Sequence, residues 1–475
     1  MSQVLTIIFG KMFGAIASVM LIRYLGAEKQ GVYAYLLTIV SLFSFISDFG
    51  LQSLLVREVK SAGDKGPAVL GNALFLQVIQ VLISIVIINI YGAFFEPSPE
   101  IKKSLMLASL AGSILYIVNP FLAAISSHEK IYLTGISNGL ASLFNAVLIF
   151  ISVTLKFPLN GIIIMLGFSN ILYLLLAGFL CLRYTIKPSF EIKKDTLVSL
   201  FKMSIPFAMI GLFNFIYSRI DVPLLYKMRP GIEVGYYTAV TKIIEILNAL
   251  VMMLMSPVYP RLSSIISTEG RDKAPRIISL TVKYMMFVVA PFAMMVSVSA
   301  ANYTNILLGH EFVKSVPALS IMIWNIFLMA IYVIPTFALN SARQAKLVMY
   351  LYCFNIFINL GFNIVLIPKY GYIATSFISV LCSLIIAAGV LYFAKVKVGN
   401  FIFFPNILRL AASMTAQLLF MKFFEKILPF VPLNLLSLMV FCASALAFRY
   451  FTREDVTIAA GLFKKNNLPK SGTVL

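Results

Sequence analysis

Six charged side chains interrupt the long apolar stretches of this sequence. They are Lys11, Asp48, Arg219, Asp221, Lys242 and Glu245. An ionised side chain at the centre of a bilayer costs about 2.5–3.5 kcal/mol on insertion scales, so such a residue faces a cavity or a partner. In a cavity, the cations could bind an anion, and the carboxylates could carry a proton or a sodium ion.

The spacing of four of these residues limits how they can pair. Arg219 and Asp221 are two residues apart, so on a helix their side chains point about 200° away from one another. Lys242 and Glu245 are three apart and share a helix face. Cross-pairing between the two stretches would satisfy all four charges. Such pairs could be salt bridges that brace the helices, or bridges that re-pair when a ligand binds.

The composition shows which medium surrounds these charges. Of the 475 residues, 60% are hydrophobic and 12% are charged, and the mean hydropathy is +0.96. Soluble domains carry about 25% charged residues, and one membrane-spanning helix needs about 20 apolar residues. The sequence therefore predicts an all-α polytopic membrane protein with about fourteen transmembrane helices. The apolar runs cover 3–23, 32–56, 69–94, 104–126, 131–155, 160–182, 203–226, 234–260, 278–300, 316–340, 347–367, 371–394, 405–425 and 431–450.

The positions of Lys and Arg predict the orientation of these spans. They are more frequent in the loops that lie on the side of the two termini, which is typical of the cytoplasmic side. Both termini are therefore expected in the cytoplasm. The net charge of +20 follows from this topology and would attract anionic lipid, so it does not indicate a nucleic-acid partner. The four cysteines lack the spacing of metal ligands, and no metal or cofactor is expected.

The sequence contains an internal repeat. "GVYAYLLTIV" at 31–40 resembles "GYYTAVTKII" at 235–244, an offset of 204 residues (from 31 to 235), and "FNAVLI" at 144–149 resembles "FNIVLI" at 362–367. Since six spans is an even number, both halves enter the membrane from the same side and form parallel repeats. The predicted segments are an N-terminal six-helix lobe (1–186), an amphipathic cytoplasmic linker (187–202), a C-terminal six-helix lobe (203–396), and two extra helices with a cytoplasmic tail (397–475).

Two blocks of sequence resemble a known family. "RYLGAEKQGVYAYLLTIVSLFSFISDFGLQSLLVREV" at 23–59 and "IDVPLL…VGYYTAVTKIIEIL…SPVYPRLS" within 220–263 are similar to the polysaccharide repeat-unit (O-antigen type) flippases. These belong to the multidrug/oligosaccharidyl-lipid/polysaccharide exporter superfamily. The resemblance implies ion-coupled flipping of an undecaprenyl-diphosphate-linked oligosaccharide, from the cytoplasmic to the outer leaflet of a bacterial cytoplasmic membrane. The implied partners are that lipid-linked oligosaccharide, membrane lipids, a coupling H⁺ or Na⁺, and other polysaccharide-assembly proteins.

The six intramembrane charges fall on the first two predicted spans of each half, which points to one central lumen. Lys11, Arg219 and Lys242 would bind the anionic head group there, and the coupling ion would use a carboxylate: Asp48, Asp221 or Glu245. The alternative is that all six form plain interhelical salt bridges. For Lys11 and Asp48, which lie at a similar depth, this structural interpretation is the stronger one.

Other functions have weaker support in the sequence. A glycan polymerase would need a sizeable outer loop with catalytic groups, and no phosphate-binding GxxxxGK[ST] motif of an ATP-driven pump occurs, so no enzyme is expected. A multidrug cation antiporter of the same superfamily usually has twelve spans. A flippase of the peptidoglycan precursor lipid has fourteen and remains an alternative.

Overall fold

The computed structural model describes residues 2–266, 274–400 and 404–451. Every regular element in these ranges is a helix, which confirms the predicted fold class. Eleven helical segments are long and apolar enough to cross a membrane, so the chain is a multi-pass membrane protein. Two of them, Met12–Ser61 and Ala345–Lys397, are far longer than one span requires. The count of fourteen spans stays a prediction.

Glycines in the left-handed region bend both long segments. Helix α1 (Ser2–Leu42) turns at Gly26, where φ is 67°, and α17 (Ala345–Lys397) turns at Gly371, where φ is 58°. A side chain is strained in that region, so glycine is the residue that allows the turn without cost. Each bend separates two runs that the sequence predicted as individual spans.

The chain forms two compact units. The first contains residues 1–247, 304–318 and 350–382, and the second contains 248–303, 319–349 and 383–475. These boundaries follow contacts rather than the sequence repeat. The predicted division into lobes at 1–186, 187–202, 203–396 and 397–475 therefore stays a prediction.

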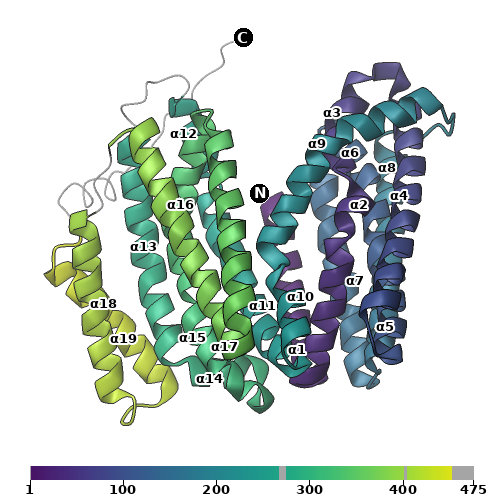
Figure 1. Ribbon diagram of the computed structural model, residues 1–475. Coiled ribbons are helices and arrows are strands. Elements are labelled where there is room, and N and C mark those ends of the chain that lie inside the picture. The colour runs from purple at the N-terminus through teal and green to yellow at the C-terminus, as the bar shows by residue number, and fades with distance from the viewer. Residues whose placement is uncertain (1, 267–273, 401–403, 452–475) are drawn as a thin grey trace. The chain divides into compact units, whose positions relative to one another are not determined.

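The first unit contains the helices of the N-terminal half together with the start of the second half. Its helices are α1, α2 (Ser44–Asp48), α3 (Leu51–Ser61), α4 (Gly66–Phe95), α5 (Pro99–Ile117), α6 (Asn119–Ser127), α7 (Ile131–Thr154), α8 (Leu159–Tyr184), α9 (Lys194–Arg219), α10 (Asp221–Met228) and the first part of α11 (Gly231–Met255), with parts of α14 (Ala300–Leu308), α15 (Val316–Met322) and α17 and the short 3-10 helices η1 (Gly63–Lys65) and η4 (His310–Ser315). Helix α1 packs along α7, and α5 packs between α4 and α8 (Figure 1).

Apolar side chains hold the first unit together and also cover its surface. Leu36, Ile39 and Val40 of α1 pack with Leu105 of α5 and Ile163 of α8 in one buried cluster. Many large apolar side chains on the same helices are exposed, as expected where lipid tails rather than water surround the protein.

The predicted linker 187–202 is only partly helical. Helix α9 begins at Lys194, and residues 186–193 are non-helical. Asn72 of α4 fixes this segment, because its amide nitrogen donates to the Glu191 carbonyl and its oxygen accepts from the Lys193 N–H, both at 2.8–2.9 Å. From there α9 runs obliquely to α10 (Figure 1).

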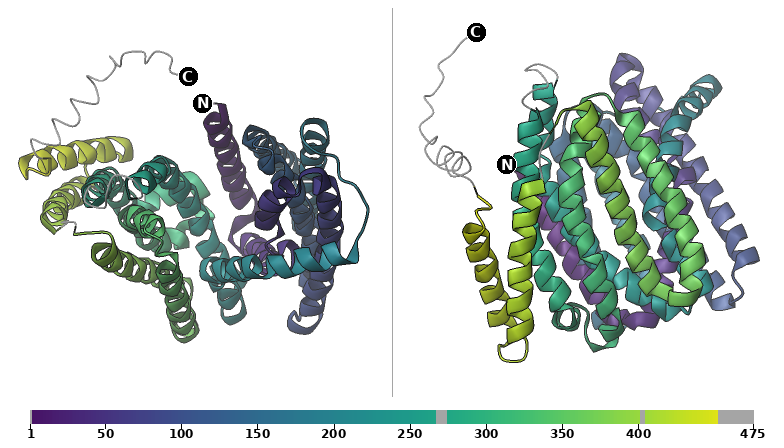
Figure 2. Two further views of the ribbon diagram at one scale, coloured as in Figure 1. Left: turned by 90° about the horizontal axis from the view of Figure 1, so that it is seen from above. Right: turned by 60° about the vertical axis from the view of Figure 1, so that its left-hand side comes forward.

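The second unit consists of the remaining helices. They are the last part of α11, α12 (Val258–Ser264), α13 (Ala274–Val298), α16 (Trp324–Ser341), α18 (Phe404–Phe424), α19 (Phe430–Ala447) and parts of α14 (Ala300–Leu308), α15 (Val316–Met322) and α17. Helix α13 packs against α16 and α18, and α18 and α19 lie side by side (Figure 2).

Candidate functional site

A polar cavity of about 390 Å³ lies within the first unit. Helices α1, α7, α8, α9 and α11 line it, so it is built from spans of both halves of the sequence. Its volume is within the range of roughly 300–1,000 Å³ found for small-molecule sites. The charged residues among its described lining are Arg219, Lys242 and Glu245.

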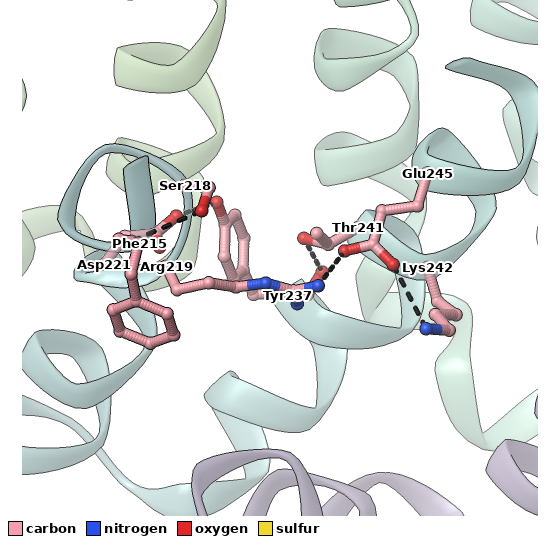
Figure 3. Close-up of polar contacts among 8 residues, drawn as sticks. All are labelled: Phe215, Ser218, Arg219, Asp221, Tyr237, Thr241, Lys242 and Glu245. Carbon is pink, nitrogen blue, oxygen red and sulfur yellow. Dashed lines mark hydrogen bonds and ion pairs between the residues drawn. The ribbon is translucent and has the colours of Figure 1, made fainter. Parts of the chain in front are cut away.

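These three residues form one ionic cluster (Figure 3). Arg219 Nη2 lies 2.6 Å from Glu245 Oε1, and Lys242 Nζ lies 3.1 Å from Glu245 Oε2. The predicted pairing across the two helices is thus found for Arg219 and Glu245. The three side chains are 33–44% exposed, so water can reach them. Two cations share one carboxylate, and the cluster carries one excess positive charge.

The break between α9 and α10 places Arg219 at the cavity. Arg219 is the last residue of α9, Ile220 separates the two helices, and Asp221 is the first residue of α10. A cation is favoured at a helix C-terminus and an anion at an N-terminus, so both charges suit their positions. The two side chains reach different partners, as their spacing predicts.

Asp221 is not part of the ionic cluster. Its Oδ2 accepts a hydrogen bond from the Tyr237 hydroxyl of α11, and its Oδ1 accepts from the Val222 N–H at 3.1 Å. Both Asp221 and Tyr237 are buried, and neither lines the cavity. The expectation that all four charges cross-pair is therefore wrong for Asp221, because a nearby tyrosine satisfies it. The residue type gave no indication of this contact, since a tyrosine in a span is more often a packing or interface residue.

Asp48 lies at the break between α2 and α3. Its Oδ1 accepts a hydrogen bond from Asn119 Nδ2 at 2.7 Å, and the backbone N–H groups of Gly50 and Gln52 also bind its carboxylate. These contacts hold the "SDFGL" turn, in which Phe49 and Gly50 are both left-handed. The side chain of Lys11 lies outside the described residues, so its pairing with Asp48 stays a prediction.

Outside the ionic cluster, another ion pair lies at the ends of α4 and α10. It joins the first half of the sequence to the second half. Lys227 Nζ lies 2.6 Å from Glu96 Oε1 and donates to the Phe95 carbonyl at 2.9 Å. The Tyr35 hydroxyl donates to the same carboxylate, and the Tyr35 ring stacks on Tyr226 with centroids 3.8 Å apart. We call Lys227, Glu96, Tyr35 and Tyr226 the latch. Nothing in the sequence pairs Lys227 with Glu96.

Removal of the cation of the latch, with its carboxylate left in place, should lower the stability of the protein. Glu96 is 1% exposed, so Lys227→Met leaves a buried carboxylate without its cation, which typically costs about 3–5 kcal/mol. Adding Glu96→Gln to the Lys227→Met variant should restore part of the lost stability. The midpoint of thermal unfolding in detergent measures both effects. Lys422→Met is the matched control, because Lys422 and Glu425 form an exposed pair that contributes little. Equal midpoints for Lys227→Met and Lys422→Met would show that the latch is not a stabilising contact.

Near the latch, α1 and α11 cross with their backbones in contact. A Cβ atom added to Gly31 would overlap the carbonyl oxygen of Gly231, and one added to Gly235 would overlap that of Ala27. The repeat offset of 204 residues carries Ala27 onto Gly231 and Gly31 onto Gly235. The contact is therefore reciprocal, as would be expected at the axis of the predicted parallel repeat. Two small residues four apart on each helix permit this approach.

Apolar helices that enclose a polar cavity are typical of a membrane transporter. Residues 1–266 match the family described as polysaccharide biosynthesis protein, which is more than half of the chain. The protein belongs to this family. It is a transporter rather than an enzyme, and the resemblance seen in the sequence is confirmed at the level of the family.

One curated relative and two solved structures are similar to the chain. The probable low-salt glycan biosynthesis flippase Agl15 of Haloferax volcanii is 23% identical over 374 residues, 74% of each protein. A lipid II flippase MurJ, in an inward closed conformation, has a TM-score of 0.80 at 14% identity and covers 95% of this chain and 99% of its own. An inward-facing MATE family multidrug transporter has a TM-score of 0.64 at 15% identity, covering 82% and 94%. The two structural matches establish the exporter fold.

Proposed function

We propose that the protein flips an undecaprenyl-diphosphate-linked oligosaccharide from the cytoplasmic to the outer leaflet of a bacterial cytoplasmic membrane, with both of its termini in the cytoplasm. The ionic cluster carries this proposal. Arg219 and Lys242 share one carboxylate, so a diphosphate finds two cations of which only one is neutralised. The guanidinium can also hold phosphate oxygens in bidentate fashion.

The same cluster offers a way to couple transport to an ion. Protonation of Glu245 would remove the charge that Arg219 and Lys242 share, and both cations would then be available to the diphosphate. A sodium ion at Glu245 would act in the same direction. Asp221 and Asp48 remain candidates for this role, although each already has hydrogen-bond partners within the protein. Lys11 remains a candidate cation of the lumen.

The second candidate is the flipping of a peptidoglycan precursor lipid. Its support is the fold similarity, over nearly the whole chain, to the lipid II flippase MurJ. A cationic cavity suits the diphosphate of either substrate. It suits a multidrug cation poorly, because the excess charge of the cluster has the wrong sign.

Deleting the gene should identify the substrate. We expect lipid-linked oligosaccharide to accumulate and surface polysaccharide to be lost, with both restored by a plasmid copy. Thin-layer analysis of extracted lipid-linked sugars measures the accumulation. If the peptidoglycan precursor accumulates instead, the second candidate is correct, and unchanged levels of both lipids would refute both.

A further inference from the structure

The two sides of the cavity differ in charge. Its charged lining residues all come from α9 and α11, in the second half of the sequence. The described residues contributed by α1, α7 and α8 carry no charge but include several hydroxyl and amide side chains. These polar residues are Ser18, Gln30, Tyr33, Thr38, Ser41, Ser142 and Asn145. We call them the neutral wall.

Two hydroxyl groups of the neutral wall can accept a hydrogen bond from a ligand but cannot donate one. Ser18 Oγ donates its proton to the Gly14 carbonyl at 2.7 Å, and Ser142 Oγ donates to the Asn138 carbonyl at 2.9 Å. A hydroxyl whose proton is used in this way can only accept a further hydrogen bond. These two hydroxyls lie on different helices, α1 and α7, and both line the cavity.

Gln30 provides a separate indication that a ligand binds here. Its side chain lines the cavity and is only 6% exposed, yet its Oε1 accepts no hydrogen bond from any residue that the structure describes. The oxygen atom itself is buried, and a buried amide oxygen without a donor is unfavourable, so a rotated amide that relieves this position would be favoured. Rotation of the amide about its last torsion exchanges the nitrogen and the oxygen, so the oxygen can turn toward a ligand.

We propose that the neutral wall is a sugar subsite, in which Gln30, Ser18 and Ser142 accept hydrogen bonds from the hydroxyl groups of the first sugars of the substrate. This inference rests on the proposed function. Phosphate oxygens at neutral pH only accept hydrogen bonds, so the hydroxyls of Ser18 and Ser142, whose protons are already used, offer them no donor and favour ligand hydroxyl groups instead. The head group is thereby oriented, with its diphosphate at Arg219 and Lys242 and its sugars against α1 and α7.

Two ligands that differ only in their sugars test the subsite. The full-length protein is purified into lipid nanodiscs and titrated calorimetrically with a prenyl diphosphate, and with the same prenyl diphosphate carrying a trisaccharide. Gln30→Leu should weaken binding of the glycosylated lipid about fivefold to tenfold, as expected for one lost hydrogen bond, and leave binding of the sugar-free lipid unchanged. Arg219→Ala should weaken both.

A matched control separates the subsite from general effects on the fold. Gln80 of α4 is also a buried amide without partners among the described residues, but it does not line the cavity, so Gln80→Leu should change neither affinity. Ser142→Ala, on a different helix from Gln30, should repeat the sugar-selective loss if Gln30→Leu proves too unstable to purify.

The outcomes distinguish the subsite from the proposed function. If Gln30→Leu weakens both ligands equally, or neither, the neutral wall is not a sugar subsite, while the proposed function stands because the wild-type protein binds both lipids. If the wild-type protein binds neither lipid, the proposed function fails and the subsite fails with it.

Discussion

Gly235→Ala is expected to reduce transport about tenfold or more, although it adds a single methyl group. That methyl group would overlap the carbonyl oxygen of Ala27, which belongs to the backbone of a helix and cannot rotate away. The crossing of α1 and α11 must therefore loosen. Overpacking a tight contact costs about 1–3 kcal/mol, and about 1.4 kcal/mol corresponds to a factor of ten. Gly31→Ala should act equally, because its contact with Gly231 is the reciprocal one.

The measurement is surface polysaccharide in deletion cells that express each variant, normalised to the amount of inserted protein. Gly361→Ala is the matched control, since a Cβ atom there meets nothing within 4 Å and alanine is the better helix former. Normal polysaccharide with Gly235→Ala at normal protein level would show that transport does not need this crossing.

Arg219→Ala should lower transport by about 10- to 100-fold, because a hydrogen bond to a charged group contributes about 1.5–3 kcal/mol. Arg219→Lys should be intermediate, because it keeps the charge and loses the bidentate geometry. The Ala variant leaves Glu245 with Lys242 alone, so the cluster has no excess positive charge. The assay is again surface polysaccharide per inserted protein.

A double variant distinguishes a ligand role of Arg219 from a structural one. If Arg219 is only a brace for α9 and α11, Glu245→Gln should rescue Arg219→Ala, because the carboxylate that lost its partner is removed as well. If Arg219 binds the head group, the double variant is inserted normally but its transport stays below that of Glu245→Gln alone. Full transport by the double variant would rule out the ligand role.

The sequence predicts the fold well because membrane insertion is encoded locally. The apolar runs are sufficient to predict an all-helical, multi-pass protein, since lipid tolerates few other structures. Arg219 could be matched with Glu245 for a similar reason: a charge in an apolar span needs a partner, and the two-residue spacing excludes Asp221.

The remaining contacts depend on distant residues and have no local signal. Asp221 is bound by Tyr237, and a tyrosine in a span is usually a packing residue, so its hydroxyl could not be assigned in advance. Glu96 and Lys227 are both near span ends, where charges are common, and only folding brings them together. Gln30 stands in a polar stretch between two spans, and its lack of a partner is visible only once its neighbours are known.

The crossing at Gly31 and Gly235 also bears on how the two halves of the chain can evolve. The contact is made by backbone atoms, so it does not require matched side chains in the two halves. If the predicted repeat arose by duplication, each half could accept substitutions independently over most of its length, provided that its own two positions stay small. Ala27 and Gly31 meet this condition in one half, and Gly231 and Gly235 meet it in the other. Weak sequence similarity between the halves is thus compatible with a crossing of α1 and α11 whose backbone contacts remain reciprocal.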